Sequence, residues 1–254
     1  LAAELHKATR EMTAYGLDKI NPDKDIKISL IEASDRLLPA LPKRMSLSVD
    51  RELKKLNVNL YLNERVTNVS ESGIQTHTGR FIPSALVVWA AGIKAPEFLR
   101  NLGLRINGIN QIIVKSTLQS IDDDSIFAFG DCAACPIKPG AKEAVPPRAQ
   151  SAHQQASLLV KTMKLLVKKK NYNLPQYSYK DYGSLVNLGR YSTVGNLMGS
   201  LTGGSMFIEG FIARIMYLML YQMHLMALHG ITVVSLRLIA KFITRRTETH
   251  VKLH

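Results

Sequence analysis

Residues 125–156 contain the side chains whose types and spacing best suit cofactor chemistry. An apolar run, Ser125–Phe129, ends in Gly130-Asp131, and a small-residue helix is predicted to begin near Ala149. Glycine lets a ligand approach the backbone closely, and a carboxylate accepts hydrogen bonds from sugar or ribitol hydroxyls. The N–H groups and partial positive charge of a helix N-terminus favour a reduced, anionic ring such as that of a flavin. We therefore expect an extended cofactor where a buried parallel strand ends at Gly130-Asp131.

Two glutamines, Gln150 and Gln154, form an i, i+4 row on the first turns of the same helix. Their amides could hydrogen-bond the carbonyl groups of a planar ligand. Without the Gly-Asp strand end upstream, ordinary solvated glutamines would be the better interpretation. Steps of three and four residues predict the buried face of this helix to be Ala149, Ala152, Ala156, Leu159, Met163 and Leu166.

A second candidate site follows two other expected strands. Residues 26–33 read as a strand with Glu32 at its end, where an acid can hold both ribose hydroxyls of an adenosine. An acid there favours NADH over NADPH, because it would repel a 2′-phosphate. Residues 85–90 read as a buried strand that ends at Ala91-Gly92. An acid after a strand is often only a solvated strand end, but the Ala91-Gly92 turn favours the functional interpretation.

The elements that must position these residues alternate between strand and helix patterns. We expect a helix near 43–56, a hairpin from 73–76 and 80–82, and strands at 58–62, 66–70, 111–115, 177–188 and 192–197. This order resembles the second half of a dinucleotide-binding fold with a β-hairpin insertion. The G-x-G-x-x-G fingerprint that would begin such a fold is absent, as is a P-loop.

The two cysteines, Cys132 and Cys135, have C-x-x-C spacing. A structural zinc needs two further ligands, and the sequence has neither a second C-x-x-C nor a paired His, so we expect no metal. A redox pair is an alternative. Two reduced thiols packed near the cofactor loop are the favoured interpretation.

The formal net charge of +13 makes nucleic acid or an anionic lipid surface the natural partner. Basic residues cluster at Lys161–Lys170 and again between Arg237 and Lys252. Neither cluster is interleaved with aromatic residues as in a nucleic-acid motif, and the second borders the most apolar part of the chain. We therefore expect a membrane surface and no nucleic acid.

The apolar C-terminal region, 206–243, has a break at Gly230. Residues 215–236 carry no formal charge and are long enough to span a bilayer, but His224 and His229 lie in their middle. Beyond them, Arg237, Lys241 and Arg245 form one helical face, joined by Arg246, with Val234, Leu238 and Phe242 opposite. A helix lying in the membrane interface is favoured, and a spanning helix or packing in a core or dimer are the alternatives.

Several segments together resemble the C-terminal portion of a bacterial type II NADH dehydrogenase, the single-subunit NADH:quinone oxidoreductase that does not pump protons. The resemblance covers nearly the whole chain, and Ala149-Gln150-Ser151-Ala152-His153-Gln154 is its most diagnostic element. The other segments are LIEASDRLLPALP, VVWAAGIKAP, FAFGDCAACP, VPPRAQSAHQQA, KDYGSLVNLG, STVGNLMG, GSMFIEG and VKLH. The chain begins at Leu1 without Met and reads as a fragment of such a protein.

The resemblance implies an α/β flavoprotein fold of two nested dinucleotide-binding domains, truncated at its N-terminus, with a C-terminal amphipathic helical membrane anchor. Expected parts are the NADH-binding domain to residue 106, a returning FAD-binding part at 107–170, and C-terminal strands and anchor at 171–254. Bound FAD would contact Gly130, Asp131, Ala149 and Gln150, and NADH would contact Glu32, Ala91 and Gly92. Gln150 and Gln154 would border the flavin ring and the quinone headgroup as the catalytic pair.

The activity implied is ping-pong two-electron transfer from NADH through FAD to a membrane quinone, at respiratory-chain entry. The protein would be peripheral, on the cytoplasmic face of the bacterial inner membrane, with lipid contact through 206–254 and a homodimer left open. The fragment alone is expected to be inactive. A sulfide:quinone oxidoreductase is the alternative enzyme, although its redox cysteines usually come from separate parts of the chain. An inactive module that only binds lipid or dimerises is the alternative of another class.

Overall fold

The computed structural model describes residues 1–13, 19–168, 173–188, 193–197 and 206–244. The chain divides into two compact units: one combines 1–87 with 182–254, and the other is 88–181. These limits differ from the domain boundaries expected at 106/107 and 170/171. The assignment of NADH-binding and FAD-binding parts to the chain stays a prediction.

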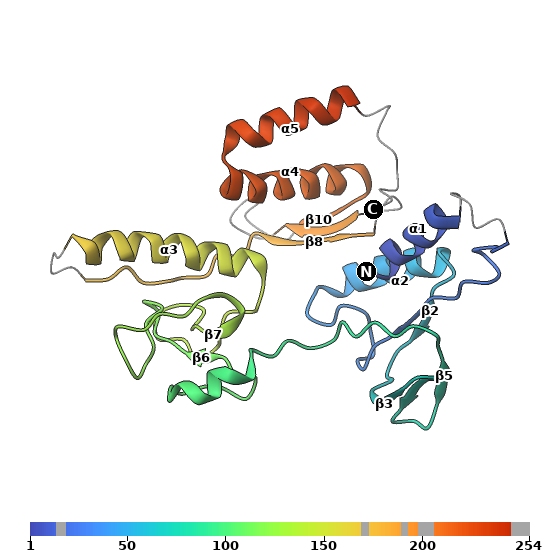
Figure 1. Cartoon of the computed structure of the whole chain (residues 1–254), viewed down its shortest axis with the longest axis horizontal. Coiled ribbons are helices and arrows are strands. Elements are labelled where there is room, and N and C mark those ends of the chain that lie inside the picture. The colour runs from blue at the N-terminus through green and yellow to red at the C-terminus, as the bar shows by residue number, and fades with distance from the viewer. Residues whose placement is uncertain (14–18, 169–172, 189–192, 198–205, 245–254) are drawn as a thin grey trace. The chain divides into compact units, whose positions relative to one another are not determined.

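After helix α1 (Ala2–Thr13), the first unit forms a strand–helix–strand arrangement, of which α2 and β2 are labelled in Figure 1. Strand β1 (Ser29–Ile31) pairs in parallel with β2 (Asn59–Tyr61), and helix α2 (Lys43–Lys55) connects them. The helix expected near 43–56 and the strand expected at 58–62 are therefore confirmed, and the first strand is shorter than its apolar run. Parallel pairing requires such a crossover, because two parallel strands cannot be joined by a tight turn.

Helix α2 is held by one apolar face. Met45, Val49 and Leu53, four residues apart, are buried and belong to a core that also contains Val58 and Val194. This core includes Ala3 from helix α1 (Ala2–Thr13). A spacing of four residues places side chains on the same side of a helix, so the sequence pattern alone determines which face of α2 is buried.

An antiparallel three-stranded sheet follows, from β3 (Val66–Ser70), β4 (Gly73–Thr76) and β5 (Phe81–Pro83). It confirms the expected strand at 66–70 and the hairpin. Gly73 has φ of +152°, and a Cβ there would collide with the Ile82 carbonyl oxygen, so glycine is required at this position. Behind the hairpin turn, the Thr78 hydroxyl donates to Glu64 Oε2 at 2.7 Å.

The C-terminal part of the same unit is a second antiparallel sheet in the order β10-β9-β8. Its strands are β8 (Gly183–Asn187), β9 (Thr193–Leu197) and β10 (Met206–Glu209). Of the strand expected over 177–188, only the second half forms. The expected turns at Gly189 and Gly203-Gly204 lie outside the described residues.

Two helices complete this unit. Helix α4 (Gly210–His229) and helix α5 (Ile231–Thr244) pack against each other and are separated by Gly230, whose φ is +80° (Figure 1). The break expected at Gly230 is confirmed, so residues 215–236 do not form one continuous helix. Helix α4 packs on the β8–β10 sheet, where Ala213 is fully buried.

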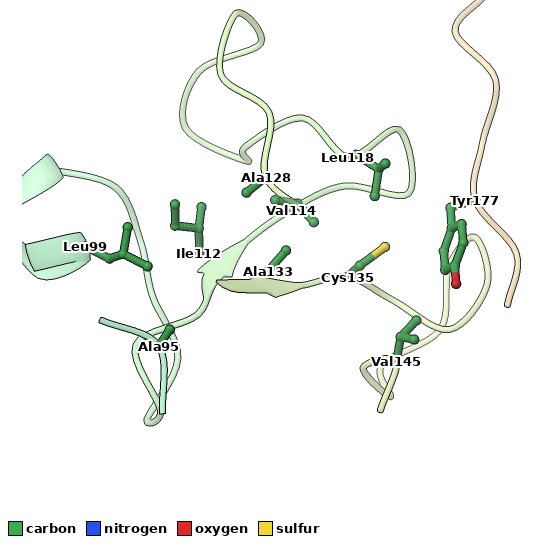
Figure 2. Close-up of a cluster of buried hydrophobic side chains, with 10 residues drawn as sticks. All are labelled: Ala95, Leu99, Ile112, Val114, Leu118, Ala128, Ala133, Cys135, Val145 and Tyr177. Atoms are coloured by element: carbon green, nitrogen blue, oxygen red, sulfur yellow. The ribbon is translucent and has the colours of Figure 1, made fainter. Parts of the chain in front are cut away.

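The second unit is mostly loops around a small core. It contains the 3-10 helices η1 (Glu97–Leu102) and η2 (Gly130–Cys132), the parallel pair β6 (Ile112–Ile113) and β7 (Ala133–Ala134), and helix α3 (Ala149–Val167). Figure 2 shows its apolar cluster, in which Ile112, Val114, Ala133 and Cys135 converge. The strand expected at 111–115 is confirmed in its centre.

Two expected strands do not form. Residues 85–90 make no strand pairing within the described part of the chain, and Leu86 and Trp89 are 77% and 63% exposed. Among the described residues, 125–129 form only a single bridge, from Phe127 to Gln119. Both runs are apolar enough for strands, but a strand also needs neighbours on both of its hydrogen-bonding edges to become a buried element.

Candidate cofactor site

The Gly130-Asp131 turn lies against the first turns of α3. Gly130 has φ of +71°, a left-handed conformation that side chains with a Cβ rarely adopt. A Cβ at Gly130 would approach the Ala152 Cβ at 3.6 Å, which places the turn in near contact with the helix. The glycine is therefore required by its backbone conformation, and the short Ala152 side chain allows the approach.

A buried glutamine of α3 binds the turn. Gln155 is only 2% exposed, and its Oε1 accepts a hydrogen bond from the Gly130 N–H at 2.7 Å. Gln155 is not among the site residues expected from the sequence. Its signal was present in the sequence, since a polar residue one step beyond the Ala149–Gln154 motif lies on the same helical face as Ser151.

The buried face of α3 therefore differs from the expected alanine and leucine stripe. The buried residues are Ser151, Gln155 and Thr162, whereas Met163 and Leu166 are 37% and 44% exposed. The stripe prediction was wrong because loops, and not an apolar layer, lie against the start of this helix. Ser151 Oγ donates to the Pro146 carbonyl at 2.9 Å, so this polar side chain is satisfied on the buried side.

A second buried glutamine holds the other end of the turn. Gln111 is 5% exposed, and its Nε2 donates to the Asp131 carbonyl at 3.0 Å. Asn107 fixes this side chain, because its Nδ2 donates to Gln111 Oε1 at 2.9 Å. The Asp131 side chain itself is exposed. The turn thus presents a carboxylate to solvent while its backbone is bound from two sides.

The expected catalytic pair, Gln150 and Gln154, lies together but is engaged within the unit. Gln154 donates through Nε2 to the Lys180 carbonyl at 2.8 Å and accepts the Lys180 N–H through Oε1 at 3.0 Å. Gln150 Nε2 donates to Asp181 Oδ1 at 3.2 Å, and Arg148 forms an ion pair with Asp181 at 3.6 Å. Residues 180–181 therefore fix the orientation of both amides beside the exposed Ala149.

The cysteines occupy different environments. Cys135 is fully buried, and burial raises the pKa of its thiol to about 12. Its side chain points toward Tyr177 in Figure 2, and burial also raises the pKa of that phenol. Cys132 is half-buried, with its Sγ 3.2 Å from the Phe129 carbonyl. Both thiols are free, and among the described residues no cluster of three or more His, Cys, Asp and Glu could hold a metal ion.

The residues of the second candidate site are divided between the two units: Glu32 lies in the first, and Ala91 and Gly92 lie in the second. Glu32 directly follows β1, and its Oε1 accepts the Ser34 N–H at 2.9 Å. Backbone bonds from Glu32 to Tyr61 and from Glu64 to Glu32 place it at the carboxyl ends of both parallel strands. Ala91 and Gly92 lie on an exposed segment of the other unit, where Gly92 has φ of +78° and the Ala91 carbonyl accepts a bond from Trp89 Nε1 at 2.8 Å.

The C-terminal helices expose most of their apolar side chains. Helix α4 is long and apolar enough to cross a membrane by length and composition, and only 6% of its most apolar window is buried. In α5, Val234 is buried but Leu238, on the same expected apolar face, is 41% exposed. Arg237 and Lys241 are exposed, as expected for the basic face. Arg245 and Arg246 lie outside the described residues.

Comparison with known proteins agrees with the resemblance seen in the sequence. The chain is 39% identical over its whole length to a type II NADH:quinone oxidoreductase of Haemophilus influenzae and covers 56% of that protein. It is 28% identical over 208 residues to a type II NADH:quinone oxidoreductase of Mycobacterium tuberculosis, covering 78% of this chain and 42% of that protein. The chain thus spans about half the length of the curated relatives it matches.

Solved structures support the same fold. The structure of NDH2 from Plasmodium falciparum in complex with NADH matches 99% of this chain and 64% of its own, with a TM-score of 0.76 at 18% identity. A family model described as pyridine nucleotide-disulphide oxidoreductase matches residues 1–156. The expected α/β flavoprotein fold is confirmed by these matches. The Gly-Asp turn lies against α3, and an acid follows β1. The chain belongs to the pyridine nucleotide-disulphide oxidoreductase family.

Proposed function

We propose that the natural protein carrying this chain transfers electrons from NADH through FAD to a membrane quinone without pumping protons. The observation that carries the proposal is the Gly130-Asp131 turn, fixed beneath α3, in a chain 39% identical over its whole length to a type II NADH:quinone oxidoreductase. The chain covers 56% of that relative, so the activity of the whole protein is inferred from this portion.

The residues around the turn fit FAD. Gly130 leaves the backbone open to a ligand, and the exposed Asp131 carboxylate can accept bonds from ribitol hydroxyls. Ala149 and Gln150, in the first turn of α3, would lie toward the flavin, where the free N–H groups of a helix start favour negative charge. Bound FAD would supply the hydride acceptance and electron delivery that these side chains cannot perform.

Glu32, Ala91 and Gly92 are proposed to bind NADH. The Glu32 carboxylate accepts one backbone N–H, from Ser34, which orients it while leaving lone pairs for ribose hydroxyls. Gly92, with its left-handed backbone, leaves space beside the nicotinamide. Replacing Glu32 by Gln should raise the KM for NADH by about 10-fold and weaken the discrimination against NADPH. An unchanged ratio of the two coenzymes would contradict this role.

Gln150 and Gln154 are proposed to orient the quinone headgroup against the flavin ring. Their bonds to Asp181 and Lys180 fix the two amide planes, and amide groups can bind further partners through their remaining N–H and lone pairs. Preset orientation reduces the entropy lost when a substrate is bound. These residues position a substrate and carry no redox chemistry themselves.

The site of action is proposed to be the cytoplasmic face of the bacterial inner membrane, contacted through residues 206–254. The exposed apolar faces of α4 and α5 and the basic Arg237 and Lys241 support contact with an anionic lipid surface. A quinone is lipid-soluble, so a binding site beside the bilayer would shorten its path. A homodimer would also cover these faces.

The test uses the natural protein that carries this chain, purified with its flavin. NADH and sulfide are compared as reductants of the bound flavin, followed by its absorbance under anaerobic conditions, and a short-chain quinone is then added. We expect bleaching by NADH, no bleaching by sulfide, and reoxidation by the quinone. Reduction by sulfide alone would favour a sulfide:quinone oxidoreductase. The burial of Cys135, with its pKa of about 12, already makes a reactive thiol pair at this loop unfavourable.

A further inference from the structure

The backbone of the Gly130-Asp131 turn is bound at both ends by buried side-chain amides. At one end the Gly130 N–H donates to Gln155 Oε1 at 2.7 Å, and at the other the Asp131 carbonyl accepts from Gln111 Nε2 at 3.0 Å. The two glutamines come from distant parts of the chain, one from α3 and one from the loop before β6. They are 2% and 5% exposed, so water does not compete effectively for either bond.

We propose that Gln155 and Gln111 form an amide clamp, a pair of positioning residues that fixes the Gly130-Asp131 turn for flavin binding. The inference rests on the proposed FAD site, because the clamp has a functional meaning only if a ligand lies at this turn. Neither glutamine needs to contact the ligand. Each acts through the backbone, by holding the direction in which the Asp131 carboxylate leaves the turn.

The physical need for a clamp follows from the local backbone. Gly130 has φ of +71°, and glycine has the greatest conformational freedom of all residues, so its left-handed state is not fixed by its own sterics. The turn is also only three residues of 3-10 helix, Gly130–Cys132. A short segment of this kind, left alone, would sample several conformations and lose ligand affinity to ordering.

The two amides are themselves held in place. Asn107 binds Gln111 twice, since its Nδ2 donates to Gln111 Oε1 at 2.9 Å and its Oδ1 accepts the Gln111 backbone N–H at 3.0 Å. The Gln155 side chain is fixed by its burial and by its bond to the Gly130 N–H. The clamp therefore has a defined polarity: Gln155 must accept a hydrogen bond, and Gln111 must donate one.

This polarity gives a sharp test, because replacing Gln by Glu should preserve FAD affinity at position 155 and weaken it at position 111. The FAD dissociation constant of the natural protein is measured with Gln155→Leu, Gln155→Glu and Gln111→Glu, at alkaline pH so that an introduced carboxyl group is ionised. Gln155→Leu should weaken FAD binding by about 10-fold and shift the absorbance maximum of the bound flavin. Gln155→Glu should bind FAD more tightly than Gln155→Leu and about as tightly as the wild type, because a carboxyl group still accepts a bond from the Gly130 N–H.

Gln111→Glu should weaken FAD binding to a similar extent, because an ionised carboxylate cannot donate to the Asp131 carbonyl. Thr162→Val is the matched control, since it removes from the same face of α3 a buried hydroxyl that has no hydrogen-bond partner among the described residues, and it should leave the FAD dissociation constant unchanged. A second readout needs no flavin: the Gly130 amide proton should exchange with solvent faster in the Gln155→Leu apoprotein than in the wild type.

The outcomes separate the two proposals. An unchanged FAD dissociation constant in Gln155→Leu, or an unchanged exchange rate at Gly130, would overturn the clamp and leave the proposed function standing. Failure of Gln155→Glu to restore affinity would also overturn it, because the acceptor would then be irrelevant. If the wild-type protein binds no flavin, both the clamp and the proposed function are wrong.

Discussion

The Gly130-Asp131 turn and the helices α4 and α5 differ in how far the rest of the chain covers them. The turn is surrounded by groups of its own unit, with buried amides on its backbone and the closed core around Cys135 beside it. Helices α4 and α5 bury few residues, among them Ala213 and Val234, and leave large apolar side chains exposed over most of their surface.

The difference indicates where each region needs an external partner. A turn whose backbone is held by two buried amides can take a polar ligand through its exposed Asp131 carboxylate. The proposed lipid contact would cover the exposed apolar side chains of α4 and α5, since a large exposed apolar patch is costly in water. The turn is therefore held in one conformation by its own unit, whereas α4 and α5 leave apolar surface exposed.

The largest expected effect tests whether the core beside the turn is closed. Because burial raises the pKa of Cys135 from 9.0 to about 12, its thiolate should be about 1000-fold scarcer than that of a free thiol at about pH 8. A maleimide should modify half-buried Cys132 and leave Cys135 intact, as read by mass spectrometry of the two labelled sites. Equal labelling of both thiols in the folded protein would contradict a closed core.

The same shift has a consequence for stability against pH. The folded-state pKa of Cys135 lies above the unfolded value, so its contribution to the free energy of unfolding is complete below about pH 9. That contribution decreases as the pH rises through the window from 9.0 to about 12. Cys135→Ala should remove this part of the alkaline dependence, measured by denaturant unfolding at several pH values.

The next effect tests the exposed apolar face of α4 as the lipid contact. Ile212, Met219 and Met223 lie on one face of α4 and are 64%, 65% and 53% exposed. Replacing all three by Ser should weaken co-sedimentation with anionic vesicles by about 60-fold, because each side chain that inserts the equivalent of about one methylene group contributes about 0.8 kcal/mol. Val167→Ser on α3, where Val167 is 81% exposed, is the control. Unchanged vesicle binding would mean that α4 is not the lipid contact.

A smaller effect tests the exposed Asp131 carboxylate of the turn. Asp131→Ala should weaken FAD binding by about 30-fold, because hydrogen bonds to a charged group contribute about 1.5–3 kcal/mol. Asp124→Ala is the control: it removes another exposed carboxylate of the same unit, one that pairs with Lys115. Comparable losses in both variants would indicate a general charge effect and contradict a specific contact at Asp131.

The smallest expected effect concerns the Tyr177 hydroxyl, which is buried and has no hydrogen-bond partner in the described part of the chain. Tyr177→Phe should increase the free energy of unfolding by about 1 kcal/mol, because the desolvation cost of the hydroxyl disappears. Chemical denaturation measures this change, with Tyr221→Phe at an exposed position as the control. A clear decrease in stability would show that the hydroxyl has a partner and that this core is less dry than its burial indicates.

Sequence patterns predicted well where a single local rule determines the structure. The four-residue spacing of Met45, Val49 and Leu53 correctly located the buried face of α2, and the Thr78-Gly79 turn correctly located the hairpin. The same rule was wrong for α3. There the apolar stripe was taken for the buried face, but Ser151 and Gln155 are buried because loops supply hydrogen bonds on that side.

The chain by itself determined the family, the positions of Gly130, Asp131 and Glu32, and the apolar character of the C-terminal helices. These follow from residue types and short-range spacing, which a linear sequence contains in full. Only the tertiary structure decided that Gln155 and Gln111, 44 positions apart in the printed numbering, bind the same turn. Hydrogen bonds between distant segments depend on how loops close in space, and no local periodicity records that closure.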